Sequence, residues 1–215
     1  MSLKSTKEQL INLLKDKDNK VLALSGKWGT GKTYMWDEVR KASEDVTDKN
    51  ALYVSLFGLT TIDQVKIKLI QSAAPTINSA TLETIKQGLK TLVKVSEGFH
   101  KSLAALGDAP LLIAPAILRE KLIVLDDIER KHEKLHIGEI LGFIDEFTQK
   151  HSCRFVLIFN IDELDTRDIW DRLREKVVDQ ELRLNTTSAE SFGIAALPTP
   201  PTYAKQISNA VEICE

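Results

Sequence analysis

The sequence predicts an α/β fold in which a parallel sheet carries helices on both of its faces. Short apolar runs typical of strands alternate along the chain with longer segments that repeat apolar residues at helical spacing. Two runs, residues 122–125 and 155–159, are apolar throughout, as expected of parallel strands buried on both faces. A third apolar run, residues 21–24, leads directly into a glycine-rich segment and then into a helix-forming stretch. These observations favour parallel strands that are joined by helical crossovers.

The first third of the chain reads as helix, strand, helix, strand and helix. The expected elements are a helix at 6–14, a strand at 20–25, a helix at 34–42, a strand at 51–56 and a helix at 62–73. Leu10, Ile11, Leu13 and Leu14 make the apolar side of the first helix. The helix at 62–73 follows Thr61, a capping residue, and ends before Pro75. A polar connection at 43–50 is expected to lack regular structure.

The second half continues the alternation of strands and helices. The expected elements are a strand at 122–125, a helix at 137–150, a strand at 155–159, a helix at 169–178 and a last strand at 181–184. The helix at 137–150 places Ile140, Ile144 and Phe147 on one side, which predicts that it packs on the sheet.

Residues 76–120 are expected to form a helical insertion between these two halves. Its apolar part, residues 103–118, contains Asp108, Pro110 and Pro115. That part is shorter than the ~20 residues that a membrane-spanning helix needs. A buried or loosely helical segment is therefore expected, and a membrane span is not.

The composition narrows the classes of protein. The 215 residues are 43% hydrophobic and 28% charged, which is ordinary for a globular protein, and a net charge of −2 does not indicate nucleic-acid binding. Cys153 and Cys214 lie far apart, so neither a disulfide framework nor a zinc site is expected. The first twenty residues are charged and lack the apolar core of a signal peptide. The expected location is cytoplasmic.

The glycine-rich segment matches the phosphate-binding pattern G-x-x-x-x-G-K-T at every fixed position. Its residues are Gly26, Lys27, Trp28, Gly29, Thr30, Gly31, Lys32 and Thr33. The glycines let successive backbone N–H groups turn inward around an anion, and the next helix directs its positive dipole end to the same place. Lys32 is expected to reach the β- and γ-phosphates, and the Thr33 hydroxyl is expected to bind Mg²⁺. This P-loop therefore predicts a nucleoside triphosphate as the ligand.

Two carboxylates follow the apolar run at 122–125. The carboxyl end of such a strand lies beside the P-loop, so Asp126 is expected to hold Mg²⁺ together with Thr33. Asp127 is expected to polarise the attacking water as a general base. The alternative is a solvated acidic turn, and the upstream P-loop argues against it.

The apolar run at 155–159 ends in a polar amide, Asn160. In NTPases of the additional-strand type, such a strand lies between the P-loop strand and the strand that ends in the metal-binding acid. Its terminal side chain contacts the γ-phosphate or the attacking water, and Asn160 is the candidate for this catalytic role. An ordinary turn residue is the alternative. The acidic loop of Asp162, Glu163 and Asp165 is expected to be solvated.

ATP is the expected nucleotide because the guanine-reading pattern Asn/Thr-Lys-x-Asp has no complete match. Residues 6–9, TKEQ, fail at the last position. An arginine can stabilise the phosphate of a neighbouring subunit. The candidates for that role are Arg130, Arg167, Arg172 and Arg174, and the sequence does not choose among them.

Taken together, these motifs resemble the KAP family of P-loop NTPases, of the STAND class. The matching segments are GKWGTGKT, YVSLFGLTTID, LIVLDDIER, FVLIFNIDELD and REKVVDQELRLN, which together span roughly residues 5–195. The resemblance implies a three-layer P-loop NTPase core whose parallel sheet has about five strands in the order 5-1-4-3-2. It also implies Mg-dependent ATP binding, hydrolysis used as a molecular switch and, for bacterial relatives, a role in antiviral defence.

On this basis residues 1–195 are expected to form the NTPase core, including the insertion at about 76–120. Residues 196–215 contain Pro198, Pro200 and Pro201 and are expected to be a linker followed by a helical stub. Members of the family are usually longer, so this tail is interpreted as the start of a truncated C-terminal module.

Three functions are compatible with the sequence. The leading one is a slow ATPase switch that associates with itself or with a protein partner. The second is a module that binds ATP or a partner without turnover. The third is a small-molecule kinase, which would need an arginine-rich lid, and none stands out before residue 122.

Overall fold

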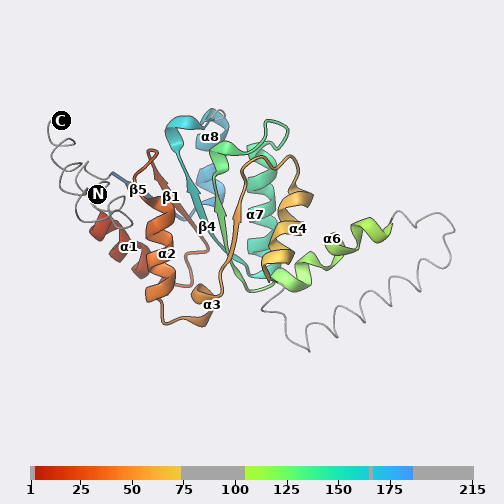
Figure 1. Ribbon diagram of the computed structural model, residues 1–215, viewed down its shortest axis with the longest axis horizontal. Coiled ribbons are helices and arrows are strands. Elements are labelled where there is room, and N and C mark those ends of the chain that lie inside the picture. The colour runs from red at the N-terminus through yellow and green to blue at the C-terminus, as the bar shows by residue number, and fades with distance from the viewer. Residues whose placement is uncertain (1–2, 74–104, 165–166, 186–215) are drawn as a thin grey trace, which may run out of the picture.

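A five-stranded parallel sheet forms the centre of the computed structural model, which describes residues 3–73, 105–164 and 167–185 (Figure 1). The strands are β1 (Val21–Gly26), β2 (Leu52–Ser55), β3 (Leu122–Asp126), β4 (Arg154–Phe159) and β5 (Gln180–Leu184). They lie in the order β2-β3-β4-β1-β5, and every neighbouring pair is parallel. Read from the other edge, this is the order 5-1-4-3-2, so the predicted fold class is confirmed.

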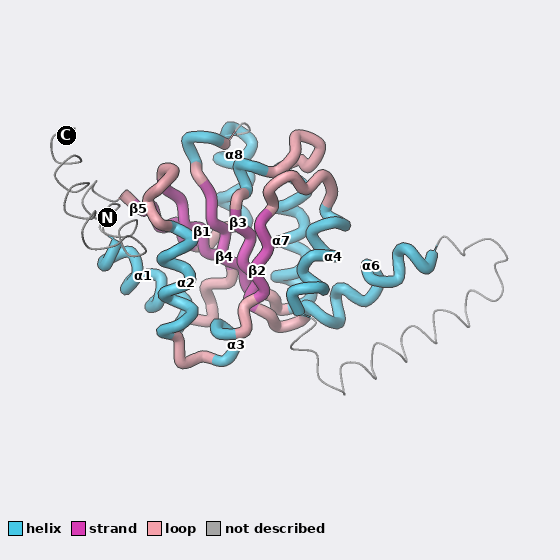
Figure 2. Tube along the Cα trace, in the orientation of Figure 1, coloured by secondary structure: helices cyan, strands magenta, loops and turns pink. Residues whose placement is uncertain are grey.

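Helices cover both faces of this sheet, as Figure 2 shows. They are α1 (Leu3–Lys15), α2 (Lys32–Ala42), α3 (Val46–Lys49), α4 (Ile62–Ala73), α6 (Ala105–Leu118), α7 (Ile137–His151) and α8 (Arg167–Val177). Two short 3-10 helices, η2 (Ile128–Arg130) and η3 (Ile161–Glu163), follow β3 and β4. In Figure 1, α1 and α2 lie on one side of the sheet, and α4 and α7 lie on the other.

Each face of the sheet has its own hydrophobic core, because successive residues of a strand point to opposite faces. In β1, Val21 and Ala23 join the core that contains buried residues of α4, α6, α7 and α8. Leu22 and Leu24 join the core that contains buried residues of α1 and α2. Burial on both faces is the reason that the strands in the middle of the sheet are apolar at nearly every position.

The expected elements coincide with the observed ones to within three residues at each end. The helix α2 begins two residues earlier than expected, because Lys32 and Thr33 of the P-loop already belong to its first turn. The connection at 43–50 was wrongly expected to lack regular structure, since it contains the single turn α3. Asp48 in this turn is buried, and its carboxylate accepts a hydrogen bond from the Ser43 hydroxyl at 2.9 Å.

The part of the insertion that the structure describes is helical. It forms α6, whose residues Ala114, Ile117 and Leu118 are buried in the core beside α4. Within the described ranges, every helix is too short or too polar to cross a membrane. The rest of the expected helical insertion, residues 76–104, and the expected linker and stub at 196–215 lie outside the described residues.

The parallel arrangement brings the candidate residues to one edge of the sheet. Gly26 ends β1, Asp126 ends β3, and Asn160 directly follows β4. Ser55 ends β2 and stands opposite Asp126 in the register of the sheet. Side chains from four neighbouring strand ends therefore converge at the edge where α2 begins.

Candidate functional site

The P-loop, residues 26–33, turns from β1 into the first turn of α2. Gly31 caps this helix with a left-handed backbone (φ 81°), which glycine adopts without steric cost. Gly26 allows the loop to pass close to β5, because a Cβ atom at this position would meet the carbonyl oxygen of Leu184 at 2.6 Å. The Thr30 hydroxyl donates to the carbonyl of Lys27 at 2.8 Å and braces the loop from within. The N-terminal end of α2 thus faces the space that the loop encloses.

The side chain of Lys32 folds back over this loop. Its ammonium group donates to the carbonyls of Gly26 at 2.8 Å and Lys27 at 2.9 Å. Burial lowers the pKa of Lys32, while the carboxylates of Glu129, Asp126 and Asp127 act in the opposite direction. Among the described residues, the half-buried Lys32 ammonium donates hydrogen bonds to loop carbonyls, and phosphate oxygens can take the place of these acceptors.

Asp126 is the acid most tightly held by its neighbours. It is buried, and its Oδ2 accepts hydrogen bonds from the Thr33 hydroxyl at 2.8 Å and from the Tyr53 hydroxyl at 2.7 Å. Its Oδ1 accepts from the backbone N–H of Asp127 at 2.7 Å. Burial, followed by the hydrogen bond to Asp126, raises the pKa of Tyr53, so this hydroxyl remains a donor.

The pair formed by Thr33 and Asp126 fits a magnesium ion. Mg²⁺ prefers oxygen ligands and is usually bound by one or two carboxylates together with substrate phosphates rather than by a cage of protein groups. In the described part of the chain, no cluster of three or more His, Cys, Asp or Glu side chains could hold a metal. A hydroxyl and one carboxylate at hydrogen-bond distance beside the phosphate loop match this mode of binding.

Asp127 lies at the same edge with both carboxylate oxygens engaged. Its backbone is left-handed (φ 57°), and it leads into η2. Oδ2 accepts a hydrogen bond from the Ser55 hydroxyl at 2.6 Å, and Oδ1 lies 3.6 Å from a guanidinium nitrogen of Arg130. The structure therefore brings the expected general base to the site but gives it two protein partners.

Asn160 is buried at the end of β4, between the strand of the P-loop and the strand of Asp126, as expected. Its side-chain oxygen accepts a hydrogen bond from the backbone N–H of Asp162 at 3.2 Å and so caps η3. Asp162 in turn lies 3.6 Å from Arg183. In this structure Asn160 therefore acts as a helix cap, which is what the alternative interpretation as an ordinary turn residue implies.

A cavity of about 310 Å³, called here the P-loop cavity, joins the loop to the acids. It is lined by Trp28, Gly29, Gly31, Lys32, Thr33, Tyr34, Asp126, Asp127, Glu129 and Arg130. A second hollow of about 500 Å³ shares Trp28, Glu129 and Arg130 with it and reaches Glu163. Most of the expected nucleotide and metal ligands therefore surround one space, and Asn160 is not among its lining residues.

Two exposed aromatic side chains hold Arg130 at the mouth of this cavity. The guanidinium carbon lies 4.1 Å from the ring centre of Phe57 and 5.3 Å from that of Trp28. The rings are 58% and 65% exposed, respectively, which is unusual for side chains of this size. Backbone hydrogen bonds from Gly58 to Arg130 (3.1 Å) and from His132 to Leu59 (3.1 Å) tie the two loops together.

The other candidate arginines lie on α8. Arg174 is ion-paired with Glu181 and with Asp171. Arg167 and Arg172 belong to the same helix, and their side chains are outside the described part of the structure. Sequence reasoning did not identify Tyr53 and Ser55 as site residues. Their spacing of two along β2 could have indicated them, because alternate residues of a strand share a face and both hydroxyls therefore point the same way.

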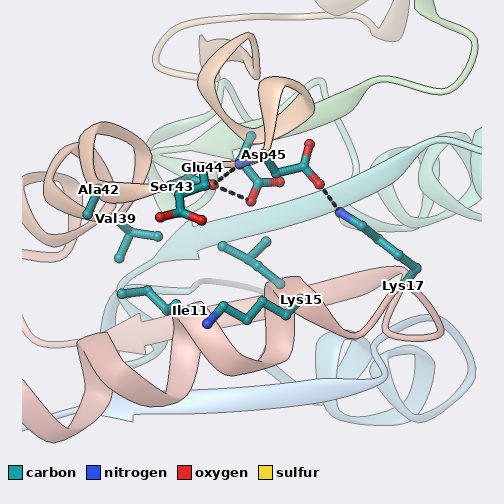
Figure 3. Close-up of a pocket in the computed structure, with 10 residues that line it drawn as sticks. Ile11, Lys15, Lys17, Val39, Ala42, Ser43, Glu44 and Asp45 are labelled. Atoms are coloured by element: carbon teal, nitrogen blue, oxygen red, sulfur yellow. Dashed lines mark hydrogen bonds and ion pairs between the residues drawn. The ribbon is translucent and has the colours of Figure 1, made fainter.

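Another cavity, of about 410 Å³, lies between α1 and the C-terminal end of α2 (Figure 3). Its charged groups are already paired in part, since Lys17 lies 2.5 Å from Asp45. This contact, followed by the backbone N–H of Thr47, lowers the pKa of Asp45 to about 2. The cavity contains none of the P-loop residues.

The sheet order, the P-loop between β1 and α2, and the acid at the end of β3 define the P-loop NTPase class of fold. A family model described as the KAP family P-loop domain matches residues 4–96, which is less than half of the chain. No curated protein gives a significant match.

The same fold occurs in a solved structure of low sequence identity. The Aeropyrum pernix ORC2 protein, solved in ADPNP-ADP complexes, is similar with a TM-score of 0.53 and 13% identity over 90% of this chain and 49% of that chain. PCH-2 of C. elegans gives a TM-score of 0.43 and 11% identity over 88% of this chain and 44% of its own. This chain therefore spans about half the length of these structures.

Proposed function

We propose that this chain binds ATP with Mg²⁺ and hydrolyses it slowly, as a cytoplasmic nucleotide-dependent switch. The observation that carries the proposal is the arrangement of Lys32 and of the Thr33–Asp126 pair around one cavity. The ammonium group is held on loop carbonyls, and the hydroxyl and carboxylate lie 2.8 Å apart. A triphosphate chain needs a cation, backbone donors and a metal site at such a spacing.

Each part of the site has a role in this proposal. The backbone of residues 26–33 surrounds the phosphates, and Lys32 moves from the carbonyls of Gly26 and Lys27 onto the phosphate oxygens. Thr33 and Asp126 hold Mg²⁺, which neutralises charge on the β- and γ-phosphates when it is bound. The attacking water needs a carboxylate, and the cavity offers Asp127, expected from the sequence, and Glu129. Asn160 would have to leave its capping hydrogen bond to reach the γ-phosphate.

Further observations support ATP as the nucleotide and a molecular switch as the function. The ORC2 protein with the same fold was solved with ADPNP and ADP, and the guanine-reading pattern is incomplete in this chain. The role as a switch of the STAND class, in bacterial antiviral defence or signalling, rests on the resemblance of the motifs to the KAP family. Association with itself or with a protein partner belongs to the same proposal.

The substitution Lys32→Ala tests the proposal. It removes the cation from the phosphate loop, so we expect loss of ATP binding at millimolar ATP and loss of Mg-dependent phosphate release. Trp28 gives a binding signal because it is exposed at the cavity, whereas Trp36 and Trp170 are buried. Its fluorescence is titrated with ATP in the wild type and in the variant.

Lys41→Ala is the matched control, since Lys41 is exposed on α2 and pairs only with Glu38 in the described structure. It is expected to bind and hydrolyse ATP as the wild type does. Wild-type protein that binds no ATP at millimolar concentration would rule the proposal out.

The second candidate is a module that binds ATP without turning it over. The observation that favours it is the engagement of Arg130 by Asp127, Trp28 and Phe57 within the same chain. No other arginine lines the P-loop cavity in the described structure. Intact binding together with phosphate release equal to that of Lys32→Ala would support this candidate. A kinase would instead transfer labelled γ-phosphate to an acceptor other than water.

A further inference from the structure

We propose that Glu129, rather than Asp127, is the carboxylate that polarises the attacking water, and that Asp127 is a positioning residue. The inference rests on the proposed ATPase function and names the group that carries out its chemical step. It follows from the different surroundings of two acids that lie two residues apart in the same loop.

Glu129 lines the cavity, and one of its carboxylate oxygens is buried without a hydrogen-bond partner in the described structure. It lies on η2, the single turn that follows β3, and it lines both the P-loop cavity and the adjoining hollow. Its Oε2 atom is buried and has no hydrogen-bond partner in the described structure. A buried carboxylate oxygen without a partner is costly unless a water or ligand supplies one. A small rotation of the Glu129 side chain would let a water in the P-loop cavity supply this partner.

Asp127 lacks this freedom. One of its oxygens accepts the 2.6 Å hydrogen bond from Ser55, and the other faces Arg130 at 3.6 Å. These two partners fix the orientation of the Asp127 carboxylate, so it is less able to turn toward a water. Its contacts instead join β2 to η2, and they fix the loop that presents Glu129.

The charge of Glu129 also acts on Lys32. Of the three carboxylates that favour the charged form of Lys32, Glu129 has the largest effect on the Lys32 pKa, ahead of Asp126 and Asp127. Lys32 is the group that holds the terminal phosphates in the proposed function. The Glu129 carboxylate and the Lys32 ammonium therefore attract each other across the same cavity.

The step is a hydrolysis. The water oxygen forms a bond to the γ-phosphorus while Glu129 accepts one proton from the water. The bond between the γ-phosphorus and the β–γ bridging oxygen breaks, and its electron pair leaves with ADP. The proton then passes from Glu129 to the inorganic phosphate or to solvent, which restores the carboxylate.

The test compares Glu129→Gln with Asp127→Asn, two changes that remove a charge and keep the shape of the side chain. Loss of a general base is expected to lower kcat by about 100-fold or more in Glu129→Gln. Removing a negative charge that faces the γ-phosphate should also raise the affinity for ATP relative to ADP by about fivefold or more. Asp127→Asn is expected to keep the ATP/ADP affinity ratio and to lose less than about tenfold in kcat.

Affinities are measured by calorimetry, so the comparison holds even where wild-type turnover is slow. Glu133→Gln, a change of an exposed residue four positions further on, is the control and should match the wild type in both measurements. Glu129→Gln with an unchanged ATP/ADP ratio overturns the inference, and so does a larger loss of kcat in Asp127→Asn. If the wild type binds ATP and releases phosphate and Lys32→Ala does neither, the proposed function stands whichever acid is the base.

Discussion

At the scale of single residues, two hydroxyl groups of β2 determine how the acids after β3 are used. Tyr53 donates to Asp126 at 2.7 Å, and Ser55 donates to Asp127 at 2.6 Å. The two residues are two positions apart and so lie on the same face of the strand, and Ser55 is paired in register with Asp126. Each hydroxyl orients one carboxylate, and Glu129 is left without such a donor.

Tyr53→Phe tests the importance of this support for the metal site. The change removes one of two hydroxyl donors to Asp126 and leaves the ring in place. Loss of a hydrogen bond to a metal ligand typically costs about 10-fold to 100-fold in metal affinity or activity. We therefore expect the Mg²⁺ concentration that gives half-maximal phosphate release to rise by about tenfold.

Binding of ATP in the presence of EDTA serves as the internal control for Tyr53→Phe and should be unchanged. Because the pKa of Tyr53 is raised, its hydroxyl remains protonated at pH 9 and the wild-type Mg²⁺ requirement should be the same there as at pH 7. An equal Mg²⁺ requirement in the wild type and the variant would show that Thr33 and the backbone N–H of Asp127 suffice to orient Asp126.

At the scale of elements, the two ends of α7 differ in how well their residues suit the local backbone. The helix α7 begins with a capping box, in which the Glu139 side chain accepts from the backbone N–H of His136 at 3.1 Å. It ends at Ser152, a residue with a left-handed backbone (φ 54°) that glycine usually occupies. Packing of Cys153 and β4 in the core holds this strained residue in place.

Ser152→Gly should therefore stabilise the protein. Glycine relieves a left-handed conformation that costs roughly 1–2 kcal/mol for other residues, and its greater freedom in the unfolded chain offsets part of this gain. We expect the free energy of unfolding to rise by about 0.5 kcal/mol in urea denaturation.

Ser43→Gly at the end of α2 is the matched control. Ser43 has φ −67° and its hydroxyl donates to Asp48, so glycine gains nothing there and loses a hydrogen bond. This variant is expected to be less stable by about 1 kcal/mol. Equal effects of the two changes would mean that backbone strain at Ser152 is negligible.

At the scale of the whole molecule, the P-loop cavity opens between exposed aromatic side chains. Trp28 and Phe57 flank Arg130 at its mouth, and Arg130 is engaged within its own chain. In the proposed function, an arginine that stabilises the γ-phosphate could then be supplied by a second molecule. Apolar rings at the mouth of the site are suited to bury surface in such a contact.

Light scattering tests this expectation directly. The average mass of the wild-type protein should increase in the presence of Mg²⁺ and ATP, and Lys32→Ala should keep its nucleotide-free mass. Phe57→Ser, which removes an exposed ring, is expected to weaken the association while ATP binding persists. A wild-type mass that does not change on ATP binding would contradict self-association and leave a different protein as the partner.

Much of this architecture could be predicted because it depends on contiguous residues. The apolar runs at 122–125 and 155–159 became β3 and β4, since strands that are buried on both faces must be apolar throughout. The turn α3 was not predicted, because Asp48 is a polar residue that becomes buried only through its bond to Ser43. Asn160 was placed correctly at the end of β4. Its capping hydrogen bond depends on η3, which forms in a segment that was expected to be a solvated loop.

The sequence by itself determined the fold class, the phosphate loop and the position of the proposed metal-binding acid, because each follows from short-range spacing between a strand, a loop and a helix. Only the tertiary structure decided which carboxylates accept hydrogen bonds from β2. Asp126 and Asp127 accept them, whereas the Oε2 atom of Glu129 has no partner in the described structure. Tyr53 and Asp126 are 73 positions apart, and Ser55 and Asp127 are 72 positions apart. Such contacts depend on the register between β2 and β3, which local sequence patterns do not specify.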